Sequence, residues 1–363
     1  MKNTFGTHVC VTLFGESHGP YIGAVLDGLA PGIAVNEDSV RRALARRAPR
    51  TDEDTPRREP DDFRFISGVK DGFTTGTPLT VLIPNTDTDS AAYEAFGNLP
   101  RPGHADYTAE CKYHGFQDAR GGGHFSGRIT AALVAVGAVC RDALAQKGIT
   151  LATRLCALGG VEDAPVTDWE NTLPALAAKD FPVADDEAGR RMKAALAEAR
   201  RQGNSVGGIT ETAVLGLPAG VGEPWFDTVE GVLSHALFSV PAVKGVAFGD
   251  GFALANMTGS AANDPLQGEK GEITHLSNHN GGVIGGITNG MPLVFRCVFK
   301  PTPSIGLPQK TVNTKTGENT VITVNGRHDA AVAPRGAAVL DAVTAITLCD
   351  LLAGRFGTDW LRG

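Results

Sequence analysis

The sequence predicts a layered α+β fold in which helices are enclosed by sheets. Two helical segments, one after Ser126 and one over residues 337–352, are apolar on almost every face, which is typical of buried helices. Strand-like segments with alternating or continuous apolar residues lie around them along the chain. Because buried helices need a cover on more than one side, the sheets are expected to enclose them.

The N-terminal half is predicted to contain two strands and two helices. The strands cover residues 9–14 and 22–29, separated by a glycine-rich turn over residues 15–19. A helix over residues 40–47 follows, because short polar side chains cap helices and proline ends them; the cap is Asn36 or Asp38 and the end is Pro49. Ser126 is expected to cap the first buried helix, which runs to about Lys147 and stops at Gly148.

The C-terminal half is predicted to add a solvated helix, two strands and the second buried helix. Residues 186–200 form a charged, amphipathic helix that ends at Gly203. Residues 210–215 and 293–299 alternate like strands, and the last helix covers 337–352. Since no repeat or low-complexity linker divides the chain, we expect one domain over residues 1–363, with residues 167–203 as a peripheral helical insertion.

Composition excludes several classes of protein. The chain of 363 residues has 33 basic and 40 acidic side chains, a net charge of −7, which disfavours a general nucleic-acid surface. Six scattered cysteines form no C-x-x-C pair, and Cys140 and Cys349 lie in the apolar helical segments, which indicates buried free thiols in a reducing compartment. No signal-peptide core is evident, and no apolar stretch is expected to reach membrane-spanning length. We therefore expect a cytoplasmic protein with neither nucleic-acid nor membrane partners.

Searches for nucleotide and metal motifs are negative. No G-x-G-x-x-G follows a strand and no G-x-x-x-x-G-K-[ST] occurs, so a Rossmann or P-loop enzyme is disfavoured. His275 and His279 have the spacing of two ligands on one helix face. The Asn and Gly residues around them favour a loop instead, and no metal site is predicted.

Two histidines lie in turns that suit catalysis. Ser17 and His18 lie in the turn after the first strand, and a histidine there can transfer a proton near neutral pH. His104 follows Pro102-Gly103, with Arg101 and Asp106 close by. For each, the alternative is a loop histidine that is bonded to backbone.

Other segments suit the binding of anions. Gly121–Gly123 lead into the helix after Ser126, where backbone amides can bind phosphate with help from Arg120 and Arg128; the alternative is a plain turn. Arg46 and Arg47 either complement a helix dipole or line an anion pocket with Arg57 and Arg58. The rigid loop Lys300-Pro301-Thr302-Pro303-Ser304 suits the edge of a cofactor, with a plain turn as the alternative. Gly326-Arg327-His328-Asp329 puts a base, a cation and a carboxylate side by side, of which some can face one site; the alternative is a surface charge cluster.

Taken in order and spacing, these motifs resemble the chorismate synthase family over almost the whole chain. Further matching segments lie at residues 217–220, 239–245 and 277–282. The resemblance implies an inner helical layer between two antiparallel sheets. It also implies conversion of 5-enolpyruvylshikimate-3-phosphate to chorismate by 1,4-anti elimination of phosphate. Members require reduced FMN, although the reaction has no net redox change.

The resemblance also implies roles for individual residues. His18 would protonate the departing phosphate, with Ser17 positioning the network. His104 would stabilise the charge on reduced FMN, and Asp329 would act with the flavin in removing the C6 proton. Substrate anions would be bound by Arg47, Arg101, Arg128 and Arg327. FMN contacts would be His124, Phe125, Ser126, Pro241, Ala242, Gly285, Lys300, Pro301, Thr302, Pro303, Ser304 and Arg327.

Two departures from the family pattern affect the expected partners. Asp52-Glu53-Asp54 stands where an arginine is usual, which weakens the case for a bound pyridine nucleotide such as NADP, and Ala330-Ala331 stands where proline is usual. We expect an external source of reduced flavin and, on resemblance, a homotetramer. The alternatives are a flavin- or phosphometabolite-binding protein without catalysis, and an enzyme that reduces its own FMN with NADPH.

Overall fold

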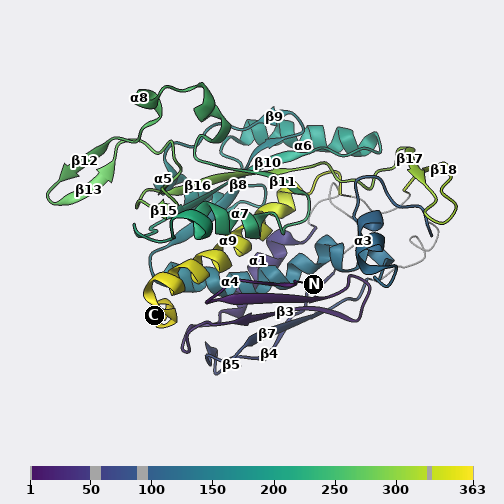
Figure 1. Cartoon of the computed structure of the whole chain (residues 1–363), viewed down its shortest axis with the longest axis horizontal. Coiled ribbons are helices and arrows are strands. Elements are labelled where there is room, and N and C mark those ends of the chain that lie inside the picture. The colour runs from purple at the N-terminus through teal and green to yellow at the C-terminus, as the bar shows by residue number, and fades with distance from the viewer. Residues whose placement is uncertain (1, 50–58, 88–96, 325–328, 363) are drawn as a thin grey trace.

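Two antiparallel sheets enclose a layer of helices, and a further helical layer covers the outer face of the second sheet (Figure 1). The computed structural model describes residues 2–49, 59–87, 97–324 and 329–362. Asp52-Glu53-Asp54, Arg57, Arg58 and Arg327 lie outside the described residues. The predicted α+β fold, with its buried helices between two sheets, is confirmed.

The first sheet has five strands in the order β1-β2-β3-β7-β4. Strand β2 pairs with β3 from Cys10 opposite Asp27 to Gly15 opposite Ile22. The turn over residues 15–19 therefore connects the end of β2 to the start of β3 at one edge of this pair. The strands of this sheet are β1 (Thr4–Phe5), β2 (Cys10–Gly15), β3 (Tyr21–Asp27), β4 (Arg64–Ser67) and β7 (Leu79–Pro84). Alternate residues of β7 are buried, as expected for a sheet with one face on the core.

The second sheet also has five strands, in the order β11-β16-β10-β8-β9. They are β8 (Thr150–Leu158), β9 (Val161–Glu162), β10 (Gly208–Leu215), β11 (Val243–Phe248) and β16 (Leu293–Phe299). Four two-stranded pairs extend from the layers: β5 (Val69–Lys70) with β6 (Phe73–Thr74), β12 (Leu266–Glu269) with β13 (Glu272–His275), β14 (Val283–Ile284) with β15 (Ile287–Thr288), and β17 (Gln309–Val312) with β18 (Asn319–Ile322). The β12–β13 hairpin projects from one end of the molecule (Figure 1).

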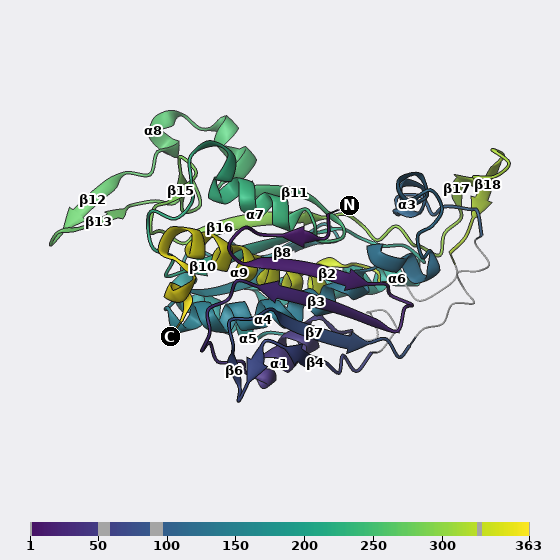
Figure 2. The same cartoon turned by 60° about the horizontal axis from the view of Figure 1, so that its bottom comes forward.

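The inner layer is built on α4 (Thr130–Gln146) and α9 (Ala333–Phe356), which pack against each other and against the two sheets (Figure 2). Helix α1 (Glu37–Arg47) packs on both, and α7 (Val229–Leu237) packs on α9 and β11. Apart from the two helices of the outer layer, the remaining described helices are α3 (Asp106–Tyr113), α8 (Gly259–Ala262), and the 3-10 turns η1 (Arg120–Phe125), η2 (Gly127–Ile129), η3 (Trp225–Asp227), η4 (Gly251–Asn256) and η5 (Thr358–Leu361). One apolar cluster runs through the inner layer and both sheets.

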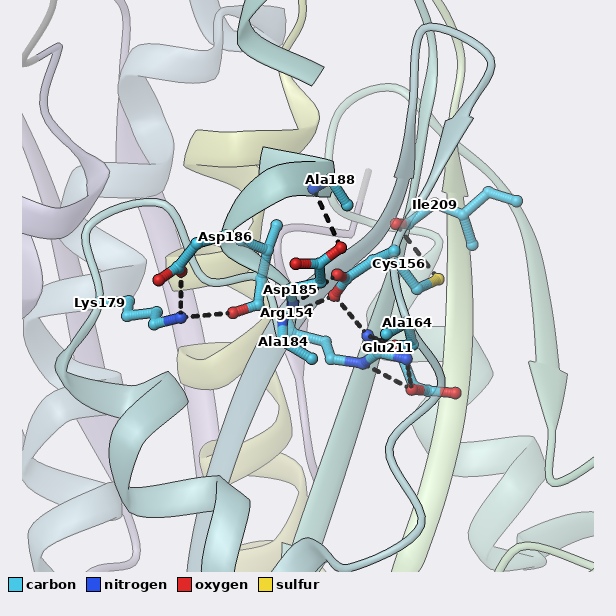
Figure 3. Close-up of polar contacts among 12 residues, drawn as sticks. Arg154, Cys156, Ala164, Lys179, Ala184, Asp185, Asp186, Ala188, Ile209 and Glu211 are labelled. Carbon is cyan, nitrogen blue, oxygen red and sulfur yellow. Dashed lines mark hydrogen bonds and ion pairs between the residues drawn. The ribbon is translucent and has the colours of Figure 1, made fainter. Parts of the chain in front are cut away.

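The outer layer consists of α5 (Trp169–Ala178) and α6 (Asp186–Arg201). Trp169, Leu173 and Leu176 of α5 form a second apolar cluster with Ala152 and Ala213 of the sheet. Arg154 of β8 lies under this layer and bonds to Glu211 of β10, to Asp163 and to the carbonyl oxygen of Ala164 (Figure 3). Asp163 also accepts bonds from the N–H groups of Ala184 and Asp185, so the outer layer is joined to the sheet by apolar contacts and by hydrogen bonds.

The length of the buried helices corrects one expectation. Residues 127–146 and 333–356 are long and apolar enough to cross a membrane, although no such stretch was expected. Their most apolar windows are 78% and 94% buried, respectively, inside the protein. Burial of this extent is typical of the core helices of a globular fold.

The predicted elements match the observed ones closely. Asn36 caps α1, accepting bonds from the amides of Asp38 and Ser39. Ser126 caps the short turn η2, which leads directly into α4, so the predicted cap lies one turn before the α-helix. Helix α9 begins at Ala333, earlier than predicted, with a proline in its first turn, where proline's missing N–H costs nothing. His275 ends β13 and His279 lies in the following loop, so they do not share a helix face.

Candidate active site

The turn after β2 holds Ser17 and His18 against the glycine run. Ser17 is fully buried, and its hydroxyl lies 3.1 Å from Nδ1 of His18. The same hydroxyl lies within 3.3 Å of the carbonyl oxygens of Arg120 and Gly121. The backbone N–H of Ser17 donates to the carbonyl oxygen of Gly123. The turn and the glycine run therefore form one bonded unit, and His18 has a defined place in it.

Only glycine fits where the run passes His18. Gly121, Gly122 and Gly123 all have φ values between 53° and 84°, a region that residues with a Cβ rarely adopt. A Cβ on Gly121 would lie 1.9 Å from Cε1 of His18, and one on Gly123 would lie 2.0 Å from the carbonyl oxygen of Asp118. The arginines that flank the run already have partners: Arg120 pairs with Asp118 and Arg128 with Asp61.

His104 is oriented by a carboxylate and an arginine. Nδ1 of His104 lies 2.6 Å from Oδ1 of Asp106, and Arg101 donates to both oxygens of Asp106 at 2.8 Å. Arg101 also donates to Oγ of Ser304 at 3.3 Å. Burial alone would raise the pKa of Asp106, but the hydrogen bonds from Arg101 and His104 outweigh it and hold the pKa well below its usual range. Asp106 is therefore ionised and fixes the ring of His104 by its Nδ1 side.

Two buried arginines share one carboxylate. Nη2 of Arg47 lies 2.8 Å from Oδ2 of Asp61, and Arg128 bonds to the other oxygen of Asp61. Asp61 has a φ of 51°, an unusual conformation for a residue other than glycine. Burial would raise the pKa of Asp61, but the charges of Arg47 and Arg128 outweigh it and lower the pKa. Burial lowers the pKa of Arg47 to about 10 despite Asp61.

Positive charge exceeds negative charge in this cluster. Among the described residues, Nε of Arg47 is buried without a hydrogen-bond partner. Arg335 connects the cluster to Asp329, since its Nε donates to the carbonyl oxygen of Arg47 and its Nη1 lies 2.7 Å from Oδ2 of Asp329. A buried guanidinium with an unused donor is suited to an anionic ligand.

A cavity of about 860 Å³ brings most of the predicted site residues together. Segments that are distant in sequence line it, among them the His104 turn, the glycine-run segment, the α7–β11 connection, the loop after β16 and the residues that lead into α9. The predicted residues in its wall are His104, His124, Phe125, Ser126, Pro241, Ala242, Lys300, Thr302, Pro303, Ser304 and Asp329. Ala242 has a φ of 73°, and its carbonyl oxygen accepts a bond from the N–H of Lys300, which joins two of the segments.

Other predicted residues lie behind the wall or away from it. Gly121, which lines the cavity, separates it from Ser17 and His18, and Arg101 lies behind His104. Arg47 is linked to Asp329 by Arg335, which bonds to both, and Arg128 is linked to Arg47 by the shared carboxylate of Asp61. Pro301 and Gly285 are not among the lining residues, and Gly285 lies at the turn between β14 and β15.

Sequence reasoning missed three polar residues next to the site: Asp61, Asn85 and Arg335. Asp61 and Asn85 lie in segments without a recognisable motif, and each has a distant partner: Asp61 and Arg128 are 67 residues apart, and Asn85 and Arg128 are 43 apart. Arg335 lies six residues after Asp329, but its bond to the carbonyl oxygen of Arg47 spans 288 residues. The one available signal was that Asp61 is an acidic residue close to a pair of arginines. Asp106, by contrast, was recognisable beside His104.

The chain is similar to members of a known enzyme family over almost its whole length. The family model for chorismate synthase matches residues 9–353. The chain therefore belongs to the chorismate synthase family. The chorismate synthase of Thermococcus gammatolerans is 45% identical over 96% of this chain and 97% of its own length. That of Korarchaeum cryptofilum is 44% identical over 95% and 96%, respectively.

A solved structure supports the same family assignment. A crystal structure of a chorismate synthase superposes with a TM-score of 0.77 at 28% identity, covering 97% of this chain and 94% of that one. The chain is thus similar over almost all of its residues to chorismate synthases, which are lyases that release phosphate.

Proposed function

We propose that this chain converts 5-enolpyruvylshikimate-3-phosphate to chorismate and that the cavity of about 860 Å³ is the active site. The observation that carries the proposal is the convergence of His104, Asp329, the glycine run and the Lys300–Ser304 segment on that cavity. In the reaction the C3–O bond to phosphate and a C6–H bond break, and a second ring double bond forms. The enzyme must therefore supply a proton donor, a proton acceptor and cationic groups that bind the two carboxylates and the phosphate of the substrate.

The cavity fits reduced FMN together with this substrate. Its volume lies in the upper range for small-molecule sites. Apolar side chains of α4 and α9, including Leu133, Val343 and Ile346, suit a flat ring, while backbone groups of residues 121–126 and the polar Lys300–Ser304 loop suit its polar edge. When bound, reduced FMN supplies an electron-rich ring that stabilises electron deficiency as phosphate leaves.

His18 is proposed as the proton donor to phosphate. Its Nδ1 lies beside Ser17, so transfer would occur through Nε2, with Ser17 and Gly121 fixing the ring. Asp329 is proposed to take part in removal of the C6 proton, and Arg335 orients it. His104, held by Asp106 at Nδ1, would present its opposite edge to the flavin. Arg47, Arg101, Arg128 and Arg327 are proposed for the carboxylates and phosphate.

An anaerobic assay tests the proposal. Protein, substrate and chemically reduced FMN are mixed, and chorismate absorbance and released phosphate are followed, with oxidised FMN as control. Equal amounts of chorismate and phosphate are expected in the presence of reduced FMN, and neither product is expected with oxidised FMN. His18→Ala and His104→Ala are expected to fold but to lose most turnover, whereas His8→Ala, which changes an exposed histidine, should keep it. Binding of flavin and substrate without product would favour a binding protein instead.

The source of reduced flavin and the assembly are also proposed. We infer an external reductant, and turnover with NADPH and oxidised FMN in the purified protein would overturn this. A homotetramer in the cytoplasm is proposed, supported by strongly exposed apolar side chains such as Trp225, Phe226, Phe252 and Ile273. Light scattering of the purified protein tests the tetramer.

A further inference from the structure

Asn85 holds both ends of the turn that carries Ser17 and His18. It follows strand β7, and its backbone N–H donates to the carbonyl oxygen of Pro20. Its side-chain Nδ2 donates to the carbonyl oxygens of Glu16 at 3.0 Å and Gly19 at 2.7 Å. Both N–H bonds of the Asn85 amide therefore donate to carbonyl oxygens of the residues directly before and after Ser17-His18.

The other side of the Asn85 amide is fixed by Arg128. Oδ1 of Asn85 accepts a bond from Nε of Arg128 at 2.9 Å. Arg128 in turn donates to Asp61 and to the carbonyl oxygen of Pro84. An arginine can only donate, so the amide can satisfy both sides only with its oxygen toward Arg128 and its nitrogen toward the turn.

We infer that Asn85 is a positioning residue that couples the Arg47–Asp61–Arg128 cluster to His18. The inference rests on the proposed role of His18 as proton donor. The turn contains Gly15, with a φ of 97°, and Gly19, so its backbone has intrinsic freedom that the Asn85 amide removes. A group that binds the phosphate and a group that protonates it thereby share one rigid frame.

Asn85→Asp separates the two functions of the side chain. Aspartate keeps an acceptor for Arg128 but has no N–H, and it places a charged oxygen against two carbonyl oxygens. We expect kcat to fall about 100-fold, since small displacements of catalytic groups have effects of that order, while KM for 5-enolpyruvylshikimate-3-phosphate stays close to wild type. Asn278→Asp is the matched control, because Nδ2 of Asn278 also donates to a backbone carbonyl, that of Pro292, away from the cavity. It should keep its kcat.

A double-mutant cycle shows whether Asn85 acts through His18. In a His18→Ala background, Asn85→Asp should cause no further loss of kcat, because the group that it positions is gone. Losses that multiply in the two backgrounds would overturn the inference and indicate a separate structural role.

Chemical modification tests the inference without relying on turnover. Carbethoxylation of His18 by diethyl pyrocarbonate, resolved by peptide mass, should be several-fold faster in Asn85→Asp than in wild type, with His8 as the internal reference. If His18→Ala retained wild-type turnover, the proposed proton donor would be wrong, and the His18 modification rate would still decide whether Asn85 holds the turn. An unchanged modification rate would overturn the inference.

Discussion

Two clusters of buried arginines among the described residues, around Arg154 and around Asp61, are built differently. Under the outer helical layer, Arg154 uses Nε, Nη1 and Nη2 on Glu211, Asp163 and the carbonyl oxygen of Ala164 (Figure 3). Arg296 adds a bond to the second oxygen of Glu211, so two arginines face two carboxylates. Beside the cavity, Arg47 and Arg128 share the single carboxylate of Asp61.

The difference shows what distinguishes a structural cluster from a binding cluster. The Arg154 cluster is neutral, and each nitrogen of its central guanidinium has a partner, so it has nothing to offer a ligand. In the Asp61 cluster, Nε of Arg47 has no partner among the described residues, and burial lowers the pKa of Arg47 to about 10. Burial of an arginine alone therefore does not indicate a ligand site, whereas the unused donor of Arg47 supports its proposed role in binding an anion.

The largest effect on stability is expected from Arg154→Met. The substitution leaves Asp163 and Glu211 buried without their central cation, and the free energy of unfolding should fall by about 3–5 kcal/mol. Urea denaturation followed by circular dichroism measures it. Arg296→Met is the control, because that side chain is 49% exposed and its ion pair should contribute about 1 kcal/mol or less. Equal losses in both variants would contradict the closed-cluster interpretation.

Arg47→Met should reverse this pattern. KM for 5-enolpyruvylshikimate-3-phosphate is expected to rise about 10- to 100-fold, the range for a lost charged hydrogen bond, because the spare donor disappears. Stability should change far less than in Arg154→Met, since Asp61 keeps Arg128. Steady-state kinetics and urea denaturation measure the two effects. An unchanged KM with a large loss of stability would indicate that Arg47 stabilises the fold, as Arg154 does, and does not bind the substrate.

The smallest effect is expected in acid. The folded-state pKa of Asp61 is lowered, so the stability from its ionised form is complete above about pH 4 and is lost as the pH falls further. Asp61→Asn should therefore be less stable than wild type at neutral pH, and the difference should shrink below about pH 4. Thermal unfolding as a function of pH measures it. A constant difference down to the lowest pH at which the protein folds would show that Asp61 acts through shape alone.

Local sequence patterns predicted the elements that depend on local physics. The caps at Asn36 and Ser126 and the strands β10 and β16 follow from short-range chemistry and side-chain alternation. The start of α9 was placed too late because Pro334 was not recognised as a first-turn residue. Helix α7 was not predicted, and the bounds of α5 were not given within the predicted helical segment 167–203, since the stability of both helices depends on packing against the second sheet or α9.

The candidate site was predictable only where a motif marked it. His18, His104 and the glycine run combine titratable groups with glycines in the sequence. The structure places His104 and Gly121 in the wall of one cavity and His18 behind Gly121. Asp61 and Asn85 lie in segments whose sequence has no such signature, and their roles come from bonds to residues far along the chain. The closed nature of the Arg154 cluster was equally hidden, because Arg154 and Glu211 are 57 residues apart.

The position of α9 in the chain has a consequence for biosynthesis. This helix lies between the sheets, yet it follows every strand of both sheets along the sequence. Its Asp350 accepts bonds from the N–H groups of Thr7, His8 and Val9, which join segments more than 340 residues apart. A nascent chain at the ribosome therefore carries the second sheet with the inner face of β8 and β10 uncovered by α9 until that helix emerges, at about 5–20 residues per second. The protein is most prone to aggregate while it is being made.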